Sequence, residues 1–351
     1  MPQDLPPEQT GPEAWYGPDM AARAGEWTHR LTAGEVAEVT AATAAALARG
    51  LDPVTLAATD FPLPQLGPRL AALRRELCHG RGFALFTGLP VESWSMAQAA
   101  TAFLGIGAHL GRPRPQNAKG HVLGHVRDLG LSAADPNVRI YQTHERQTFH
   151  TDSADVVGLL CLRQAPRGGD SALVSSTTLF NELRRRRPDL LRLLMEPIAT
   201  DRRGEVPAGM KPFFSIPVFT YAGGRVTCIY QRQYIDSAQR FPEAPRLTAA
   251  HVEALDLFDA LANDPALNFH MRLSPGDMQF VHNHCMLHDR TAFEDWPEPE
   301  RRRHMLRLWL AVPGDRELDP AFAERFGGTA IGERGGVSVP GLRPTVPLEA
   351  V

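Results

Sequence analysis

The stretch FHTDSADVVGLLCL, residues 149–162, carries the clearest information about the fold. Its second half is a short apolar run rich in valine and leucine, which is typical of a buried β-strand. Its first half places His150 and Asp152 two residues apart, and two such side chains leave the same face of an extended strand. Asp155 has the opposite parity and is expected to point away from that face. The stretch therefore predicts a strand that begins either with a polar end in solvent or with two ligands aimed at one point.

Short strands and several helices are expected on both sides of this stretch, separated by turns rich in glycine and proline. A helical N-terminal layer followed by many short strands indicates a mainly β protein of the α+β class, a sandwich or jelly roll decorated with helices. The expected helices cover residues 32–50, 68–80, 95–109, 178–195 and 248–264, and the expected strands cover 81–90, 138–142, 150–162, 171–176, parts of 211–236, 277–284 and 303–312.

The composition is that of an ordinary globular protein, with 351 residues of which 43% are hydrophobic and 22% charged. We expect a loosely ordered arm over residues 1–30, because this segment is rich in proline, glycine and acids. One domain is expected over 31–325, with its sheet core at about 81–312, followed by a Gly/Pro-rich tail over 326–351.

Charge and apolar patterning argue against several classes of partner. The net charge is −3, so no overall basic field exists to attract nucleic acid. The arginine run LRRRRPD, 183–189, is expected to be a solvated helix face. No run of 18 apolar residues and no signal-peptide pattern is present, so a cytoplasmic protein without a membrane partner is expected. The four cysteines lie far apart and are expected to be reduced.

A metal site would need a third ligand besides His150 and Asp152. The stretch LSPGDMQFVHNHCMLHDRTAFED, 273–295, supplies His282, His284 and His288 close to a turn and a strand. Two histidines and one carboxylate on one face of an ion leave the opposite face open, as in non-haem Fe(II) oxygenases. The alternative is that an HxD pair occurs by chance and that each histidine is an ordinary hydrogen-bonded residue.

The stretch RRRHMLRLWLAV, 301–312, places two arginines on one face of an apolar strand. Arg303, Met305, Arg307 and Trp309 share that face. Buried guanidinium groups need anions, and a guanidinium pairs well with a carboxylate through two hydrogen bonds. A dicarboxylic cosubstrate would satisfy them, and so would salt bridges at a sheet edge.

Four short motifs together resemble the taurine dioxygenase/TfdA-like family of Fe(II)- and 2-oxoglutarate-dependent oxygenases. They are HTD at 150–152, GGDS at 168–171, LHDRTAF at 287–293 and RRHMLRLWL at 302–310, in the order in which the family carries them. The resemblance runs from about residue 81 to 312. It implies a double-stranded β-helix, or jelly roll, with N-terminal helices and an insertion of helices and loops between the two halves of the metal site.

The resemblance also implies roles for individual residues. His150, Asp152 and His288 would be the iron ligands. Ser171 stands where the family usually has a threonine whose hydroxyl bonds the distal carboxylate of the cosubstrate, and Arg303 fits the arginine that pairs with that carboxylate. Arg307 fits a second arginine that holds an anionic group of the substrate or approaches the cosubstrate.

One departure from the family concerns His284, which stands where relatives often have an arginine after an asparagine. His284 could support the iron ligands from behind or compete with them. This alternative stays open at the level of the sequence.

The activity implied by the resemblance needs Fe(II), 2-oxoglutarate and dioxygen. It would oxidise an unactivated C–H bond of a small molecule, most simply by hydroxylation, and release succinate and CO2. Desaturation and cyclisation use the same oxidant. Asn117, Arg232 and Tyr234 are candidate substrate residues because their segments would flank the pocket, and Arg232 together with Arg307 favours a carboxylate-bearing, anionic substrate.

Two other functions are compatible with these residues. A protein with this triad could bind metal and 2-oxoglutarate as a sensor or a lapsed oxygenase, or it could use the metal to activate water in hydrolysis. Release of succinate from 2-oxoglutarate separates the oxygenase from both. The sequence leaves open the substrate, the oxidised carbon and the oligomeric state, and a homo-oligomer is compatible with it.

Overall fold

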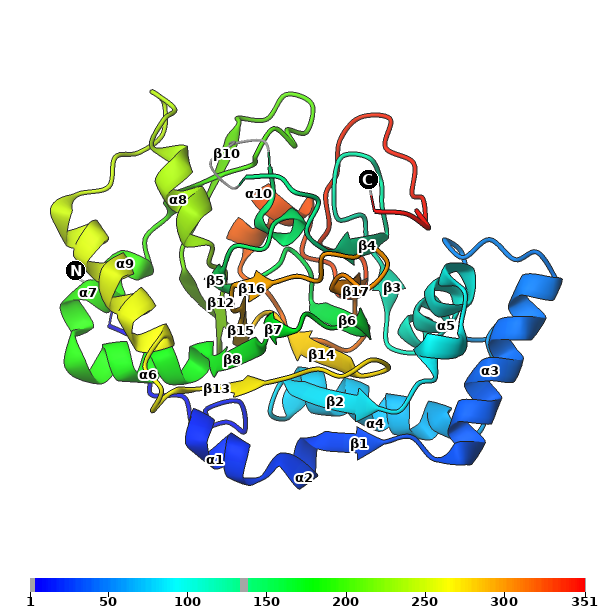
Figure 1. The fold of residues 1–351 in the computed structure, drawn as a ribbon. Helices are drawn as coiled ribbons and strands as arrows, with labels where there is room; N and C mark the ends of the chain where they lie inside the picture. Colours follow the sequence, from blue (N-terminus) through cyan, green and yellow to red (C-terminus); the bar gives the residue numbers. More distant parts are fainter. Residues whose placement is uncertain (1–3, 133–137, 351) are drawn as a thin grey trace.

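Two facing β-sheets form the centre of the protein, and helices cover the outer face of each sheet (Figure 1). The computed structural model describes residues 4–132 and 138–350. Helices α3, α4 and α5 cover the larger sheet, whereas α6, α7 and α9 cover the smaller one. The expected jelly roll, a mainly β fold with helical decoration, is confirmed.

The larger sheet has the strand order β1-β2-β14-β6-β17-β3, with β4 also paired to β17. All pairings within it are antiparallel except that of β1 with β2. Its strands are β1 (Thr28–Arg30), β2 (Phe83–Thr87), β14 (Met278–His282), β6 (Val156–Arg163), β17 (His304–Ala311), β3 (Arg112–Pro113) and β4 (Leu123–Val126).

The smaller sheet is antiparallel with the order β13-β8-β15-β5. Its strands are β13 (Asn268–Met271), β8 (Ser171–Ser175), β15 (Met286–Arg290) and β5 (Gln147–His150). Three further pairs lie outside the two sheets: β9 (Ile198–Asp201) with β10 (Phe213–Ile216), β11 (Phe219–Ala222) with β12 (Arg225–Cys228), and β7 (Arg167–Gly168) with β16 (Phe293–Glu294).

The helices follow from local sequence signals, such as the capping box of Thr32 and Glu35 at the start of α3. They are α1 (Gly17–Ala22), α2 (Ala24–Trp27), α3 (Ala33–Ala48), α4 (Leu66–His79), α5 (Met96–Ala108), α6 (Ser176–Arg186), α7 (Pro188–Leu194), α8 (Arg232–Ala238), α9 (Ala249–Ala262) and α10 (Ala323–Phe326). Short 3-10 turns cover Val91–Ser93, Ile140–Gln142 and Pro320–Phe322.

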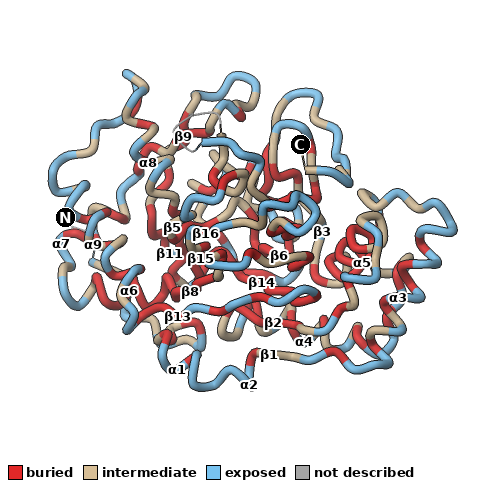
Figure 2. The backbone as a smooth tube through the Cα atoms, in the orientation of Figure 1, coloured by how far each residue is buried: buried red, intermediate tan, exposed pale blue. Residues whose placement is uncertain are grey.

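Period-two alternation determines which side chains enter the space between the sheets. On β17, Leu306 and Leu308 pack under the helices, whereas Met305 packs in the cluster that both sheets share. On β15, Leu287 packs toward α6 and α9, so His288 and Arg290 have the parity of the interior. Figure 2 shows that the buried chain is concentrated in the strands of both sheets.

The N-terminal segment packs on the sheets through two tryptophans. Within its described residues, Trp15 and Trp27 are buried and pack edge-on or tilted against Phe83 and Phe269. The indole of Trp15 donates a hydrogen bond to the backbone carbonyl of Arg81. Burial of two large aromatic side chains outweighs the unfavourable composition of the segment. The division into an arm, a domain and a tail stays a prediction.

Four local expectations are corrected by the structure. Residues 150–162 form two strands rather than one, because the chain leaves the smaller sheet at His150 and enters the larger sheet at Val156. The strand expected at 138–142 contains a 3-10 turn, and the β-rich stretch 211–236 ends in helix α8. The helix expected at 178–195 is broken before Pro188, since the residue that precedes a proline disfavours helical geometry.

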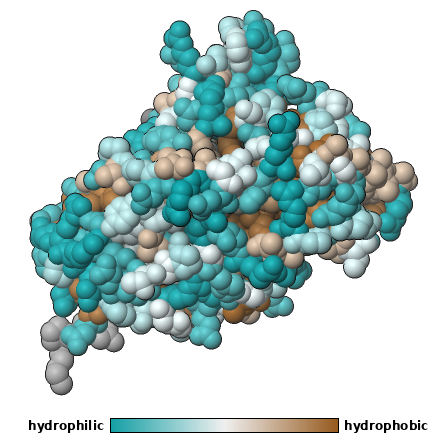
Figure 3. Space-filling model, turned by 90° about the horizontal axis from the view of Figure 1, so that it is seen from below, coloured by the Kyte–Doolittle hydropathy of each residue, from teal (hydrophilic) through white to brown (hydrophobic). Residues whose placement is uncertain are grey.

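No helix in the described ranges is long and apolar enough to cross a membrane. The face shown in Figure 3 is mainly hydrophilic, with hydrophobic residues visible in smaller areas between polar ones. Assembly into a homo-oligomer stays a prediction.

Candidate active site

His150, Asp152 and His288 meet at the edge of the space between the two sheets. His150 ends β5 and lies opposite His288 of β15, so the two imidazole rings are 4.1 Å apart between centroids. Asp152 lies in the connection from β5 to β6, and its oxygens are 3.9 Å from Nε2 of His150 and 3.8 Å from Nε2 of His288. All three ligand atoms lie within 4.8 Å of one another, so one metal ion could contact all three.

The protonation states of the three side chains suit a divalent cation. Burial lowers the pKa of His150 and, together with His150, lowers the pKa of His288 to about 3. Burial alone would raise the pKa of Asp152, but Arg307 and the two histidines hold it at about 2. At neutral pH the site therefore offers two neutral imidazoles and one carboxylate, the forms in which these groups bind metal.

Hydrogen bonds fix the orientation of these side chains. The carbonyl of Thr148 can only accept, so the Nδ1 of His150 at 2.9 Å donates to it and leaves Nε2 free to bind a metal. Asp152 accepts hydrogen bonds from the indole of Trp309 at 2.8 Å and from Arg307 at 3.1 Å. The amide nitrogen of Gln147 lies 2.8 Å from Nε2 of His150, so an ion at this atom would replace that contact.

A cavity beside the triad contains two buried arginines that lack anionic partners. It is lined by His150 and His288, and also by Ser171, Arg290 and Arg303. Arg303 is 2% exposed, and its Nε and Nη1 have no hydrogen-bond partner among the described residues. The same is true of Nε and Nη1 of Arg290. Burial lowers the pKa of Arg303 to about 10, and burial together with Arg303 lowers that of Arg290 to about 9.

The local backbone brings these groups together. Ser171 on β8 is the register partner of Arg290 on β15. Gly169 has φ +73°, and a Cβ there would lie 2.7 Å from Nε of Arg303, so the glycine allows the guanidinium to pass close to the turn. Unpaired buried guanidiniums are costly, and a carboxylate would supply the missing acceptors. The donor set thus fits 2-oxoglutarate as well as iron.

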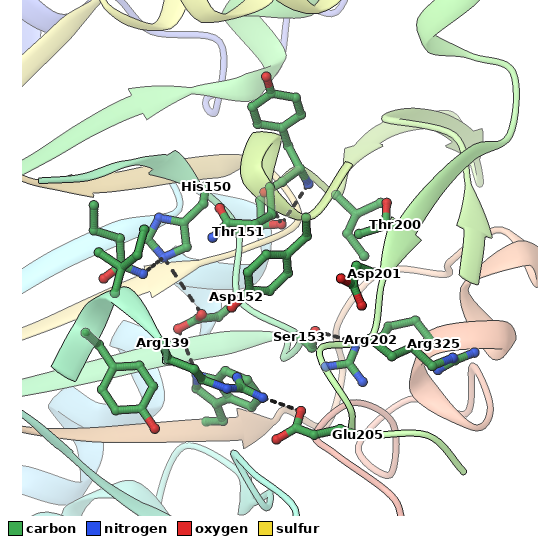
Figure 4. A pocket seen from close by; sticks show the side chains of 18 of the residues that line it. Arg139, His150, Thr151, Asp152, Ser153, Thr200, Asp201, Arg202, Glu205 and Arg325 are labelled. Atoms are coloured by element: carbon green, nitrogen blue, oxygen red, sulfur yellow. Dashed lines mark hydrogen bonds and ion pairs between the residues drawn. The ribbon is translucent and has the colours of Figure 1, made fainter. Parts of the chain in front are cut away.

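A second cavity lies on the other side of the triad (Figure 4). Both cavities are lined by Tyr141, Gln147, His150 and Arg307, so the triad lies between them. The second cavity also contains three arginines from separate segments: Arg139, Arg202 and Arg325.

The remaining candidate residues fall in different places. Tyr234 lines the second cavity. Arg307 lines both cavities and is bonded to Asp152 and to the side-chain oxygen of Gln116. Asn117 bonds to its own loop at Lys119 and His121 and lines neither cavity.

Arg232 also lies outside both cavities. Its guanidinium is neutralised by Asp236, Asp256 and Asp259, at 3.0, 2.8 and 2.8 Å. It has therefore no free charge to offer to a substrate. Its segment does flank the pocket, as Tyr234 shows, but Arg232 begins helix α8 and lies beside acids of α8 and α9.

The two other histidines of the HNHCMLH stretch point away from the triad. His282 contacts Asp315 at 2.8 Å, and His284 contacts Asp155 at 2.8 Å. Both contacts are fully buried and continue to Arg334. The sequence leaves His284 open as a supporting or a competing residue, and its contact with Asp155 shows that it does not compete with the triad for an ion. Asp155, as expected from its parity, stays away from the triad.

Some residues of the site escaped the sequence analysis. Arg290 shares strand parity with His288, so the HDR spacing alone could have pointed to it. Arg202 and Arg325 lie outside the motifs considered. The packing of α10 against β10, which pairs with β9, brings them to the cavity.

Comparisons with known proteins agree with this site. The model of the family described as taurine catabolism dioxygenase TauD, TfdA family matches residues 47–309. FR-33289 synthase of Streptomyces rubellomurinus (strain ATCC 31215) is 33% identical over 318 residues, 88% of this chain and 92% of the relative. A uridine-5'-phosphate dioxygenase of Amycolatopsis sp is 30% identical over 186 residues, 49% of this chain and 63% of the relative.

A solved structure shares the fold. The crystal structure of the non-heme iron oxygenase OrfP in complex with Fe and alpha-ketoglutaric acid matches with a TM-score of 0.61 at 15% identity, over 81% of this chain and 93% of that one. The family match spans most of the chain and includes both histidines and the aspartate of the triad. The chain therefore belongs to the taurine catabolism dioxygenase TauD, TfdA family and is a dioxygenase that uses Fe(II), 2-oxoglutarate and dioxygen.

Proposed function

We propose that this dioxygenase oxidises, most simply by hydroxylation, an unactivated C–H bond of a small anionic molecule. The observation that carries the proposal is a pair of buried arginines, Arg303 and Arg290, beside a cluster of two histidines and an aspartate. Nε and Nη1 of each guanidinium have no hydrogen-bond partner among the described residues. With iron and 2-oxoglutarate bound, the site supplies C–H oxidation coupled to the release of succinate and CO2.

In this proposal each cavity has its own ligand. His150, Asp152 and His288 hold Fe(II), and the cavity with Arg303 receives the distal carboxylate of 2-oxoglutarate. Ser171 donates its hydroxyl to the same carboxylate. Arg290 adds a second positive charge, which the family resemblance did not imply.

Arg307 is proposed as a positioning residue for Asp152. It also adjoins both the 2-oxoglutarate cavity and the substrate cavity. Its Nη1 is 3.1 Å from Oδ2 of Asp152, and its Nε is held at 2.8 Å by Gln116. The guanidinium also lies 4.8 Å from the ring centre of Tyr141. These contacts fix the aspartate and keep it ionised, so that one oxygen remains directed to the iron.

The substrate cavity supports an anionic substrate. Three arginines line it in addition to Arg307, and Tyr234 offers a hydroxyl. One of the relatives is named as a dioxygenase of uridine-5'-phosphate, which is a small anionic molecule. Release of succinate separates this function from a sensor or a hydrolase.

The proposed function is tested by a screen of small carboxylates, phosphate esters and phosphonates with Fe(II), ascorbate and 2-oxoglutarate. A substrate is expected to stimulate succinate formation and to yield a product with one added oxygen atom, detected by mass spectrometry. Stimulation by neutral molecules alone would contradict the proposed anionic class.

Replacing Arg303 by methionine is expected to raise the KM for 2-oxoglutarate about 100-fold. Loss of two charge-assisted hydrogen bonds corresponds to about 3 kcal/mol. Methionine fills similar apolar space and leaves no buried charge, so the variant should fold. Succinate formation as a function of 2-oxoglutarate concentration gives the KM.

The matched control for this variant is Arg301→Met, two residues away and exposed. Its KM should stay within about twofold of that of the unmodified protein, because surface substitutions are close to neutral. If both variants behave alike, Arg303 does not bind the cosubstrate.

A further inference from the structure

The second cavity carries positive charge that neither iron nor 2-oxoglutarate explains. Arg139 precedes the 3-10 turn at Ile140, Arg202 follows β9, and Arg325 belongs to α10, yet all three line one cavity. Figure 4 shows Arg202 and Arg325 on the side of Ser153 that lies away from His150. Three segments far apart in the sequence thus each place one arginine side chain in this cavity.

Arg202 has a buried charge without an acidic partner. It is 2% exposed, and its Nε and Nη2 donate only to backbone carbonyls, those of Lys211 at 3.2 Å and Glu324 at 2.6 Å. Its Nη1 is buried and has no hydrogen-bond partner among the described residues. Backbone carbonyls satisfy hydrogens but carry no net charge. Among the described residues Arg202 forms no ion pair, and the carboxylate of Glu324 favours its charge only from a distance.

Arg325 is placed beside Arg202 by a shared aromatic ring. Both guanidiniums lie over Phe214, at 5.4 Å for Arg202 and 5.7 Å for Arg325. Nε of Arg325 donates to the hydroxyl of Ser153 at 3.0 Å, and Ser153 is the neighbour of the metal ligand Asp152. Burial and the nearby Arg139 and Arg202 lower the pKa of Arg325 to about 10, although Glu205 opposes this.

The acids that line the cavity do not balance these charges. Glu205 forms an ion pair with Arg139 and also accepts from the backbone of Ala118. The carboxylate of Asp201 is occupied by Arg240 at 3.0 Å and by the hydroxyl of Ser237 at 2.5 Å, so it is not available to the cavity. Asp152, the third acid of the lining, pairs with Arg307 at 3.1 Å. Of the described acids that line the cavity, Glu205 therefore offsets one guanidinium, that of Arg139, and the charges of Arg202 and Arg325 remain in excess.

A tetrahedral dianion matches this excess better than a carboxylate does. A carboxylate carries one charge and fills a single guanidinium fork, whereas a phosphoryl group carries nearly two charges and three strong acceptor oxygens. The hydroxyls of Ser153 and Thr200 line the same cavity and can donate to further oxygens. Substrate binding would supply an acceptor for the unpaired Nη1 of Arg202 and a negative charge beside Arg325.

We propose that Arg202 and Arg325, supported by Arg139, form a subsite for a phosphate-ester or phosphonate group of the substrate. This inference deepens the proposed function and rests on it, because it names the chemical class of the substrate. The subsite adjoins Ser153, so the anionic end of the substrate lies next to the loop that carries the iron ligand. The anion orients the rest of the molecule toward the triad.

The test is binding of small probes to the protein loaded with Fe(II) and 2-oxoglutarate without dioxygen. Methyl phosphate, methylphosphonate, inorganic phosphate and acetate are titrated, with calorimetry as the readout. The phosphorus-containing probes are expected to bind at least tenfold more tightly than acetate. A preference between methyl phosphate and methylphosphonate then identifies the source of the group.

Variants of Arg325, with a control elsewhere in the chain, test whether the probes bind at the proposed subsite. Arg325→Met is expected to weaken binding of methyl phosphate and methylphosphonate at least tenfold. Arg325→Lys keeps the positive charge and should lose less affinity than Arg325→Met. Arg343→Met, an exposed arginine elsewhere in the chain, should bind as the unmodified protein does. Equal affinity for acetate, or unchanged binding by Arg325→Met, overturns the inference.

The inference and the proposed function can fail separately. Succinate formation by the unmodified protein with Fe(II) and 2-oxoglutarate tests the chemistry without any probe. A protein that forms succinate with stimulation by carboxylates alone, and that does not bind the phosphorus-containing probes, keeps its proposed function but has no phosphoryl subsite.

Discussion

Replacing Asp152 by asparagine is expected to lower succinate formation at least about 1,000-fold, which corresponds to about 4 kcal/mol of lost transition-state stabilisation. The amide cannot supply the negative charge to the metal, and it leaves Arg307 buried, at 5% exposure, without its carboxylate. Affinity for Fe(II) should fall by more than the roughly 10–100-fold that is typical when a residue hydrogen-bonded to a metal ligand is replaced. An anaerobic Fe(II) titration and a succinate assay measure the two effects.

The control for this prediction is Asp189→Asn, an exposed aspartate on α7. It should retain both iron affinity and succinate formation. His150→Ala should behave as Asp152→Asn does, whereas His284→Ala should still bind iron, because His284 contacts Asp155 rather than the triad. Wild-type consumption of 2-oxoglutarate by His150→Ala would show that the triad is assigned wrongly.

The sequence predicted the members of the triad but not the way in which the backbone presents them. Parity on a single strand was the argument for His150 and Asp152, yet the strand ends at His150. Asp152 reaches the same point because its backbone nitrogen bonds to Asn283 at 3.0 Å and its carboxylate to Trp309. These contacts are long-range, so they could not be read from local pattern.

Strand parity predicted the direction of the side chains better on the buried strand β17. On β17 it placed Met305, Arg307 and Trp309 on one face, and the structure packs the alternate leucines under the helices. The same reasoning applied to β15 would have paired Arg290 with His288 on one face. Arg290 therefore has a signal in the sequence, its spacing of two residues from His288, in addition to its place in the cavity.

The substrate side could not be predicted in the same way. Arg139, Arg202 and Arg325 are separated by long segments, and their convergence depends on how α10 and β10 pack. In the sequence, Arg232 is as plausible a partner for an anionic substrate as any of these three arginines. Only the positions of Asp236 and Asp259 show that its charge is already satisfied.

A buried arginine from the C-terminal segment closes the core behind the metal site. Arg334 is 1% exposed and donates to Asp155 at 2.7 Å and to Asp315 at 2.9 Å. His284 contacts the same oxygen of Asp155, and burial lowers the pKa of that histidine to about 4, so it is neutral at pH 7. Arg334 is therefore the charge that both carboxylates share, and it ties the Gly/Pro-rich segment to the loop after Asp152.

Replacing Arg334 by methionine is expected to destabilise the protein by roughly 3–5 kcal/mol, because two buried carboxylates lose their shared cation. The Tm should fall by about 4–7 °C, measured by differential scanning calorimetry. The matched control is Arg343→Met, an exposed arginine of the same segment, which should shift the Tm by less than about 2 °C. A similar small shift for Arg334→Met would mean that Asp155 and Asp315 do not depend on it. The expected large shift would instead show that the segment beyond β17, which composition alone marks as a tail, is part of the folded core behind the triad.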